Sequence, residues 1–470
     1  MAEAKRLSVR TKTAFGIGAT AEAAISIVFN SFNFLFYNNV LGLSGTLCGL
    51  AVTIAMVFDA VSDPLVGSIS DRFRSRLGRR HPFLYAAPVP MAFCFVAIYS
   101  PPSSLEEFGL FIWFTVSTVL LRTATTFYHV PHLALGAEMT TDYGERSVIM
   151  SYNTIFALIG TSGTYYLAWS YFGTLDAGTS DRNGYVTLSA AVAVFAIFVI
   201  FASAYFTRDQ VARLSKAPAN LPRFSLKGLL DEVVVCLRND NFRVLLFGMI
   251  FLSSTLGLHE TLTAHIGLFF FGLAEDQIRF LALGAPPGLM IATILTPKLH
   301  LWFDKRETLI VGILGMTTSV AGPIVLRLFG WFPENGAPAL FPILCVLKGT
   351  SYAASAIMVI SIVSTLADVT DEHELVTGLR QEGIFFASRS FFSKLTSGLG
   401  HLLAGIAIDV IAFPVGVRPG EIDPDTLYRF GVVAGPLTVL PAFISLFFFA
   451  RYGIDKARHA EIRRELDARA

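Results

Sequence analysis

The sequence predicts an all-α membrane protein with twelve transmembrane helices arranged as two six-helix bundles. Of its 470 residues, 53% are hydrophobic and 15% are charged, whereas soluble domains carry about 25% charged residues. A transmembrane helix needs about 20 mostly apolar residues, and the chain has room for about twelve such helices joined by short loops. A polar connection in the middle of the chain leaves six apolar segments on each side.

The apolar segments follow one another along the whole chain. They cover residues 14–41, 46–69, 82–100, 108–138, 147–173, 185–206, 242–273, 277–299, 308–330, 338–367, 381–412 and 426–451. These limits predict four parts, namely a first bundle over 1–206, a central loop over 207–241, a second bundle over 242–452 and a tail over 453–470. The tail is charged, and we expect a short helix whose surface is solvated.

A weak internal repeat supports the division into halves. Asp71 and Arg72 follow the second segment of the first half, and Asp304, Lys305 and Arg306 follow the second segment of the second half. Repeats of this kind are typical of transporters built from two related bundles, with a site near the middle of the membrane.

The distribution of Lys and Arg predicts that both termini are cytoplasmic, because cytoplasmic loops are enriched in these residues. The basic residues gather after the second and eighth segments, in the central loop and in the tail. Those of the central loop are Arg208, Arg213, Lys216, Arg223 and Lys227, and Pro218 and Pro222 lie among them. We therefore expect an integral plasma-membrane protein, in the inner membrane of a bacterium, with lipid around it. The net charge of +1 gives no reason to expect a nucleic-acid partner.

Two carboxylates end the second apolar segment. Asp59 and Asp63 are four residues apart, which places them on one face of a helix. Charged side chains within a membrane are costly and usually functional, and two like charges side by side need a cation or a proton between them. The pair predicts a site for a coupling cation. The alternative is that one or both acids lie at the cytoplasmic end and bond to water or arginine.

Other polar residues interrupt the apolar segments of the first half. Glu22 lies in the first segment, where it faces either a cavity or the cytoplasmic rim. Arg122, Thr126 and His129 share one face of the fourth segment, followed by Pro131, which disturbs the helix. This polar stripe favours a substrate path over simple packing.

In the second half, Lys348 and Lys394 lie within apolar segments. A deep lysine in one half and the acid pair in the other would offset each other's cost of burial. Arg389 lies nearer the cytoplasmic end, and we expect it to form a gate ion pair. His259 and His265 flank Glu260 but are six residues apart, which does not match the zinc-protease motif, so they line a gate or a cavity. No constellation of catalytic residues is present in the sequence, and we expect neither an enzyme nor a cofactor beyond the coupling cation.

Two motifs carry a resemblance to a known family. The first runs from Phe58 through Asp59, Asp63 and Pro64 to Gly67 and continues into the basic loop 74–83. The second comprises residues 368–375 and 380–386. Both resemble the glycoside–pentoside–hexuronide:cation symporters, a branch of the major facilitator superfamily that includes the melibiose carriers and the animal sodium-coupled lysolipid carriers. The resemblance covers most of the chain.

The resemblance implies a cation site made by Asp59, Asp63 and Thr126, with Lys394 beside it. Ser62 stands where the melibiose carriers have an asparagine ligand, which leaves the choice among Na⁺, Li⁺ and H⁺ open. The galactose-binding acids and tryptophan of those carriers are not matched, because Ala23, His129 and Leu133 stand in their places. Galactoside recognition is therefore not expected.

These observations lead us to expect cation-coupled symport, with Na⁺ or H⁺, of a sugar or glycoside by alternating access. The substrate would contact Glu22, Arg122, His129, Lys348 and Lys394. The inner gate would be held by ion pairs of the basic loop and of helix eleven. Its residues are Arg72, Arg79, Arg80, Glu138, Asp142 and Arg389. A carrier of a lysolipid or another amphipathic substrate is the main alternative; a uniporter and a non-transporting sensor are others.

Overall fold

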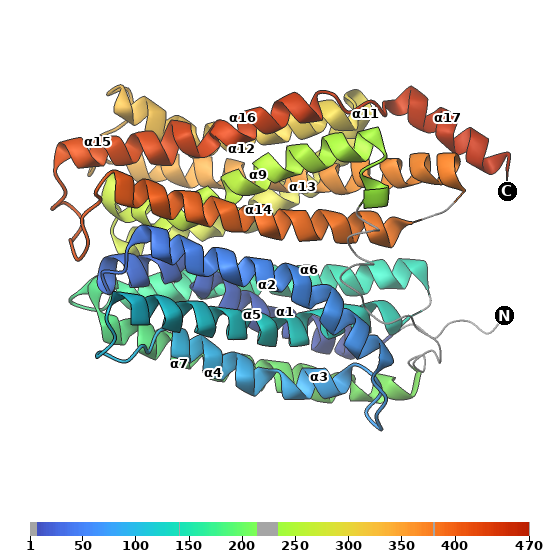
Figure 1. The fold of residues 1–470 in the computed structure, drawn as a ribbon, viewed down its shortest axis with the longest axis horizontal. Helices are drawn as coiled ribbons and strands as arrows, with labels where there is room; N and C mark the ends of the chain where they lie inside the picture. The colour runs from blue at the N-terminus through green and yellow to red at the C-terminus, as the bar shows by residue number, and fades with distance from the viewer. Residues whose placement is uncertain (1–6, 141, 214–233, 379–380, 470) are drawn as a thin grey trace. The chain divides into compact units, whose positions relative to one another are not determined.

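The computed structural model describes residues 7–140, 142–213, 234–378 and 381–469. Within these ranges all regular elements are helices, in agreement with the all-α prediction. The chain divides into two compact units, Met1–Phe224 and Ser225–Ala470, and in each unit the long helices run side by side (Figure 1). The basic and proline residues predicted between 214 and 233, and Arg380 of the second motif, lie outside the described residues. The predicted domain limits stay predictions.

The first unit consists of six long helical segments. Their elements are α1 (Val9–Phe34), which continues as a π-helical turn (Leu35–Val40), α2 (Gly45–Arg72), α3 (His81–Ala86) with α4 (Pro88–Ile98), α5 (Glu107–Glu138), α6 (Tyr143–Phe172) and α7 (Arg182–Thr207). Short 3₁₀ turns occupy Gly178–Ser180 and Arg208–Arg213.

Side-chain caps explain where several of these helices begin. Ser8 accepts a hydrogen bond from the backbone N–H of Thr11 at the start of α1, and Ser44 accepts one from Leu47 at the start of α2. Such caps satisfy backbone donors that the first turn of a helix leaves without partners. Because of these caps, each helix can begin directly after the polar residues of the preceding loop.

The second unit repeats this series. Its elements are α9 (Asp240–His265) with a π-helical turn (Ile266–Phe270), α10 (Glu275–Ile278) and a 3₁₀ turn (Arg279–Gly284) leading into α11 (Ala285–Trp302), α12 (Lys305–Leu328), α13 (Leu340–Thr377), α14 (Glu382–Val410), α15 (Pro424–Val432) with a π-helical turn (Val433–Leu437) and α16 (Thr438–Phe449), and α17 (Lys456–Asp467).

The two units share one packing pattern. In the first, α1 packs against α6 and α7, α2 against α5, and α4 against α5 and α7. In the second, α9 packs against α14 and α16, α11 against α13, and α12 against α13 and α16. In each unit the first long segment thus packs against the fifth and sixth, the second against the fourth, and the third against the fourth and sixth. This correspondence gives the weak sequence repeat a structural basis.

Eleven helical segments of the described chain are long and apolar enough to cross a membrane. The predicted segment 147–173 forms α6, which is 30 residues long but is not among the eleven. Its sequence contains many Ser, Thr, Tyr and Gly residues, which lower its hydropathy. It is nevertheless packed along α1, where Gly160 allows close approach to the backbone of Thr20.

The predicted segment 338–367 is too short, because the acidic stretch that follows it, which we expected to be a cytoplasmic loop, is helical. Helix α13 continues to Thr377 and ends at Gly378, whose φ of 73° suits glycine. The helix can continue because its acids have partners. Asp368 accepts two hydrogen bonds of 2.7 Å from Lys305, and Glu372 accepts hydrogen bonds of 3.0 Å from Asn239 and Asn241.

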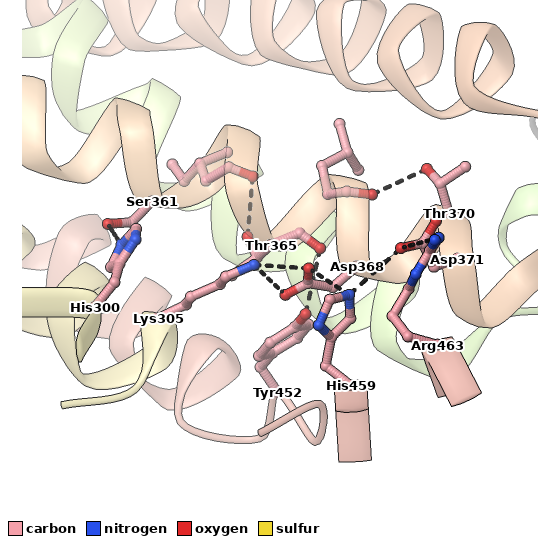
Figure 2. A network of polar contacts seen from close by, with 12 residues as sticks. His300, Lys305, Ser361, Thr365, Asp368, Thr370, Asp371, Tyr452, His459 and Arg463 are labelled. Carbon is pink, nitrogen blue, oxygen red and sulfur yellow. Dashed lines mark hydrogen bonds and ion pairs between the residues drawn. The ribbon is translucent and has the colours of Figure 1, made fainter. Parts of the chain in front are cut away.

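The tail forms a helix, as expected, but one of its faces is packed rather than solvated. Ile462 of α17 is fully buried. His459 Nε2 lies 3.3 Å from Asp368 Oδ1 and 3.4 Å from Asp371 Oδ2, and Arg463 lies 3.6 Å from Asp371. Figure 2 shows this network between α13 and α17. These residues are spaced by three and four along α17 and so share one face.

The network also joins the segment between α16 and α17. The Tyr452 hydroxyl donates to the carbonyl oxygen of Thr365 at 3.2 Å. Burial raises the pKa of the Tyr452 phenol well above its usual range, so the phenol keeps the proton that it donates. Arg469 donates to the carbonyl oxygen of Leu375 at 2.6 Å. The tail is thus fixed to α13 along its length.

Small residues set the closest helix contact of the second unit, between α9 and α14. A Cβ atom added to Gly400 would collide with the carbonyl oxygen of Ser254, whereas one added to Gly163 of α6 would meet no atom within 4 Å. We expect Gly400→Ala to lower the free energy of unfolding by about 1–3 kcal/mol through overpacking. Gly163→Ala should raise it by about 0.5–1 kcal/mol, because the alanine loses less backbone entropy on folding.

Denaturant unfolding of both variants in detergent micelles measures the difference. The glycine-to-alanine substitution should therefore change the free energy of unfolding in opposite directions at the two positions. Equal effects would show that the α9–α14 contact is not as close as the structure places it.

The buried carboxylate of Asp368, with a side chain 5% exposed, depends on Lys305. We expect Lys305→Met to lower the free energy of unfolding by about 1–3 kcal/mol, the cost of removing a partner from a buried polar group. Arg458→Gln is the control, since Arg458 pairs with Glu461 where both side chains are exposed, and its stability should not change. If Lys305→Met has the same free energy of unfolding as the unsubstituted chain, His459 is a sufficient partner for the Asp368 carboxylate without Lys305.

Candidate functional site

The acid pair of α2 meets α5 at a shared hydroxyl. Thr126 Oγ1 lies 3.0 Å from Asp59 Oδ1 and 3.0 Å from Asp63 Oδ1. The two carboxylate oxygens are therefore at most twice that distance from each other. Asp59 is 5% exposed and Thr126 is 3% exposed. The structure thus brings together the three residues that the sequence assigned to one cation site.

The local sequence explains how the acids are presented. Asp59 and Asp63 are one helical turn apart on α2, so both face the same neighbouring helix. Pro64 follows inside the helix and has no N–H to give to the carbonyl oxygen of Ala60. Ser62, the fourth predicted cation residue, donates its hydroxyl to the backbone oxygen of Asp59 at 3.3 Å. In this structure its proton is therefore directed at the backbone.

Arg122 lies with the acids. Its guanidinium Nη1 is 3.7 Å from Asp59 Oδ2, one turn before Thr126 on α5, and its charge lies over the ring of Phe29 at 5.4 Å. The sequence assigned Arg122 to the substrate. The geometry adds a second use, because a positive group next to Asp59 offsets part of the charge of the acid pair.

Glu22 and His129 form a second polar pair, between α1 and α5. His129 Nδ1 lies 2.6 Å from Glu22 Oε1, and the side chains are 41% and 20% exposed respectively. Both were predicted substrate residues on separate segments, and the structure brings them into contact. The pair presents a carboxylate and an imidazole, which together can accept and donate hydrogen bonds.

A buried polar chain beyond this pair was not predicted. His132 is 1% exposed; its Nδ1 lies 3.3 Å from the Tyr128 hydroxyl and its Nε2 lies 3.0 Å from Asn153 Oδ1. Phe15 stacks on the imidazole with ring centroids 4.3 Å apart. The signal was in the sequence, because His132 continues the polar stripe of α5 by three residues beyond His129.

The basic loop after α2 is bound to the end of α5. Glu138 accepts a hydrogen bond from Arg79 Nε at 3.1 Å and from Arg80 Nε at 3.0 Å. Arg80 is 4% exposed and also donates to Ser70 at 2.6 Å and pairs with Asp71. The structure thus contains the ion pairs that the sequence predicted among Arg79, Arg80 and Glu138.

Three other predicted gate residues are placed differently. Asp142 caps α6, accepting a hydrogen bond of 2.7 Å from the backbone of Glu145, because its short side chain lies directly before the first turn. Arg72 has buried Nε and Nη2 atoms without a hydrogen-bond partner in the described chain. For Arg389 of α14, the described residues provide no ion pair, and its predicted gate role stays a prediction.

The two predicted lysines lie in the second unit. Lys348 of α13 has its Nζ atom 5.5 Å from the centre of the Tyr352 ring. Lys394 of α14 is partly buried, next to Ser393, whose hydroxyl is 3.0 Å from that of Ser253. These two lysines lie on different helices, and the predicted compensation between a deep lysine and the acid pair stays a prediction.

Comparisons with known proteins relate the chain to a family of transporters. Residues 14–456 match the family model described as MFS/sugar transport protein. The chain is 26% identical to the inner membrane symporter YicJ of Escherichia coli strain K12, over 85% of this chain and 82% of that one. It is 23% identical to the isoprimeverose transporter of Lactiplantibacillus pentosus, over 79% and 74% of the two chains.

A vertebrate relative and a solved structure extend the comparison. The chain is 23% identical to the sodium-dependent lysophosphatidylcholine symporter 1-A of Danio rerio, over 99% of this chain and 89% of that one. The fold resembles that of the xylose transporter XylE from E. coli, with a TM-score of 0.62, 14% identity, and coverage of 97% and 98% of the two chains. The chain, which is a transporter and not an enzyme, therefore belongs to the MFS/sugar transport family of the major facilitator superfamily.

Proposed function

We propose that this protein is a symporter that couples the movement of a cation, Na⁺ or H⁺, to that of a sugar or glycoside by alternating access. The observation that carries the proposal is the Thr126 hydroxyl at 3.0 Å from both Asp59 and Asp63. Two of the relatives are an inner membrane symporter and an isoprimeverose transporter, which supports symport and a sugar-like substrate.

The chemistry of the acid pair favours a cation. A hydroxyl has one proton, so Thr126 can donate to one carboxylate at a time while its oxygen remains an acceptor. Two carboxylates and this oxygen then make an oxygen-rich site of negative charge. Hard cations such as Na⁺ prefer oxygen ligands, and a proton bound by one acid would relieve the same repulsion.

Arg122 gives this site a way to respond to the cation. In the structure its guanidinium lies 3.7 Å from Asp59 and supplies the positive charge that the acid needs. A bound cation would compete with this contact and free the guanidinium for a substrate hydroxyl. Coupling then follows, because two ligands that favour the same arrangement of Arg122 each increase the affinity for the other by the same factor.

Substrate recognition is assigned to the remaining predicted residues. The contact of Glu22 with His129 at 2.6 Å offers an acceptor and a donor, as a sugar with neighbouring hydroxyls requires. Lys348 and Lys394 are the substrate residues predicted in the second unit. The alternative substrate is a lysolipid or another amphipath, which the name of the zebrafish relative supports.

The proposal includes the orientation of the chain in the membrane. Both termini are cytoplasmic, on the grounds of the Lys and Arg distribution, in a plasma membrane of the bacterial inner-membrane type. The contacts of Arg79 and Arg80 with Glu138 then belong to a cytoplasmic latch, which closes or opens the inner side of the first unit.

The acid pair can be tested without knowledge of the substrate. We expect Na⁺ or Li⁺, or protonation where H⁺ is the coupling ion, to raise the melting temperature of the purified protein. A ligand that binds only the folded state stabilises it by RT ln(1 + [L]/Kd). Asp59→Asn and Asp63→Asn should each abolish this shift. Thr126→Ala should weaken the apparent cation affinity about tenfold, the loss of one hydrogen bond to a charged group, and Thr126→Ser should restore it.

Thr123→Ala is the matched control, because the Thr123 hydroxyl donates to the carbonyl oxygen of Val119 on its own helix. Its cation response should equal that of the unsubstituted protein. A cation shift that survives in both Asn variants would contradict the assignment.

The substrate class is tested by the same measurement with two ligand sets. Sugars and glycosides form one set, and lysolipids the other, each with Na⁺, with Li⁺ and with neither ion. A symporter substrate should stabilise the protein more when the coupling cation is present. Cation-dependent stabilisation by a glycoside supports the main proposal, and the same result with a lysolipid alone would replace it by the alternative.

A further inference from the structure

A pocket lies entirely within the second unit. The space inside it that a water-sized molecule can occupy is about 80 Å³, and it is lined by α9, α12, α13 and the segments that follow α9. Nine of its fourteen lining residues are apolar or glycine, and the polar ones include His259 and Lys348.

Lys348 brings a positive charge to the wall of this pocket. Its ammonium group has three donors and no acceptor. In the described part of the chain it forms no ion pair, and its recorded contact is the Tyr352 ring at 5.5 Å. Ionisable residues within a membrane are costly, and they usually serve a ligand or a partner. Lys348 therefore faces the pocket with hydrogen-bonding capacity to spare.

His259 adds a second donor on the opposite helix. Both of its ring nitrogens are buried, and neither has a hydrogen-bond partner among the described residues. Buried polar atoms are nearly always paired in folded proteins, so a group that enters the pocket is the natural partner of this imidazole.

The hydroxyls of the pocket divide into two kinds. Thr263 donates to the carbonyl oxygen of His259 at 2.7 Å, and Ser319 donates to that of Gly315 at 2.7 Å, so their protons are in use within their own helices. Ser351 lies three residues after Lys348, on the same face of α13. Lys348, His259 and Ser351 are therefore the three groups with protons available to a ligand.

No Asp or Glu is among the described residues that line the pocket. Glu260 follows His259 in the sequence but does not line the pocket, and its carboxylate lies 3.8 Å from His401 Nε2. The pocket therefore offers donors and positive charge without a compensating carboxylate. The hydroxyl oxygens and a neutral imidazole can also accept hydrogen bonds, so it is the positive charge of Lys348, with no carboxylate beside it in the described lining, that favours an acidic group over a neutral sugar.

We propose that this pocket binds the acidic group, a carboxylate or a phosphate, of a substrate whose body is apolar. Lys348 and His259 receive the acidic oxygens, and the side chains of Phe271, Leu344 and Leu347 cover the body. The inference rests on the proposed transport function and narrows its amphipathic alternative to acidic compounds.

The probes are two pairs, each made of an acid and an uncharged counterpart. 4-Phenylbutyrate and its neutral amide test a carboxylate, and phenyl phosphate and phenol test a phosphate. Binding is measured by calorimetry on the full chain in nanodiscs. We expect at least one acid to bind about tenfold or more tightly than its neutral partner, because hydrogen bonds to charged groups are the stronger ones.

Substitutions locate the binding. Lys348→Met should weaken the acid about tenfold or more, as expected for the loss of a charged hydrogen bond, and leave the affinity for the neutral partner within about twofold, a difference too small to count as a lost hydrogen bond. Lys348→Arg should recover part of the loss, and His259→Gln should weaken the acid to a smaller extent. Lys298→Met makes the same charge change at an exposed lysine outside the pocket and should bind like the unsubstituted protein.

Retained binding of the neutral partner by Lys348→Met shows that this variant is folded; its melting temperature provides the same check. Binding of one acid but not the other supports the proposal and names the group. Equal binding of acid and neutral partner, or an acid affinity that Lys348→Met leaves unchanged, overturns it. The absence of binding by both acids also overturns it.

Measurements in NaCl and in choline chloride, at two pH values, separate this inference from the proposed function. If acid binding needs Lys348 but does not change with the cation or with pH, the pocket is supported as an acid site and the proposed coupling to a cation is contradicted. A cation or proton response that depends on Asp59 and Asp63, together with acid binding that does not need Lys348, supports the proposed function and overturns the pocket.

Discussion

The Thr126 hydroxyl has a single proton and two carboxylates within reach of it, each at 3.0 Å. Two acids on one face of a membrane helix are tolerable only with a nearby source of positive charge or of protons. The structure supplies Arg122 to Asp59 at 3.7 Å and a shared donor in Thr126. The pairing of α2 with α5 brings these groups together, and α4 packs against the same α5 and against α7.

The sequence was sufficient to predict the core of this site. Helix periodicity places residues four apart on one face, so Asp59 and Asp63 could be paired without a structure, and the family resemblance pointed to Thr126. The Arg79, Arg80 and Glu138 contacts were also predictable, because opposite charges at the ends of adjacent segments tend to meet. The functions assigned to these residues remain predictions. Their proximity is what the structure adds.

Other features depended on contacts between distant parts of the chain. The length of α13 was underestimated because the acids Asp368 and Asp371 are typical of a loop until Lys305, His459 and Arg463 are placed beside them. His259 was expected to line a gate or a cavity, and it lines the pocket of the second unit. Its lack of a hydrogen-bond partner among the described residues and the polar chain of His132 were missed for the same reason. A histidine pattern does not show which helix faces it, so the sequence could exclude a zinc motif without locating the pocket.

The docking of α17 has a consequence for how the second unit is made. Asp371 and its partner His459 are 88 positions apart, so α13 is synthesised well before α17. While the chain is still being synthesised, the carboxylates at the end of α13 lack the imidazole and guanidinium that later contact them. Lys305 precedes Asp368 in the chain and can donate to it as soon as α13 has been made. The lysine therefore stabilises this carboxylate before α17 has been synthesised. The contacts at the end of α13 are thus completed only after α17 has been made, and a chain without α17 would lack the partners that His459 and Arg463 provide to these carboxylates.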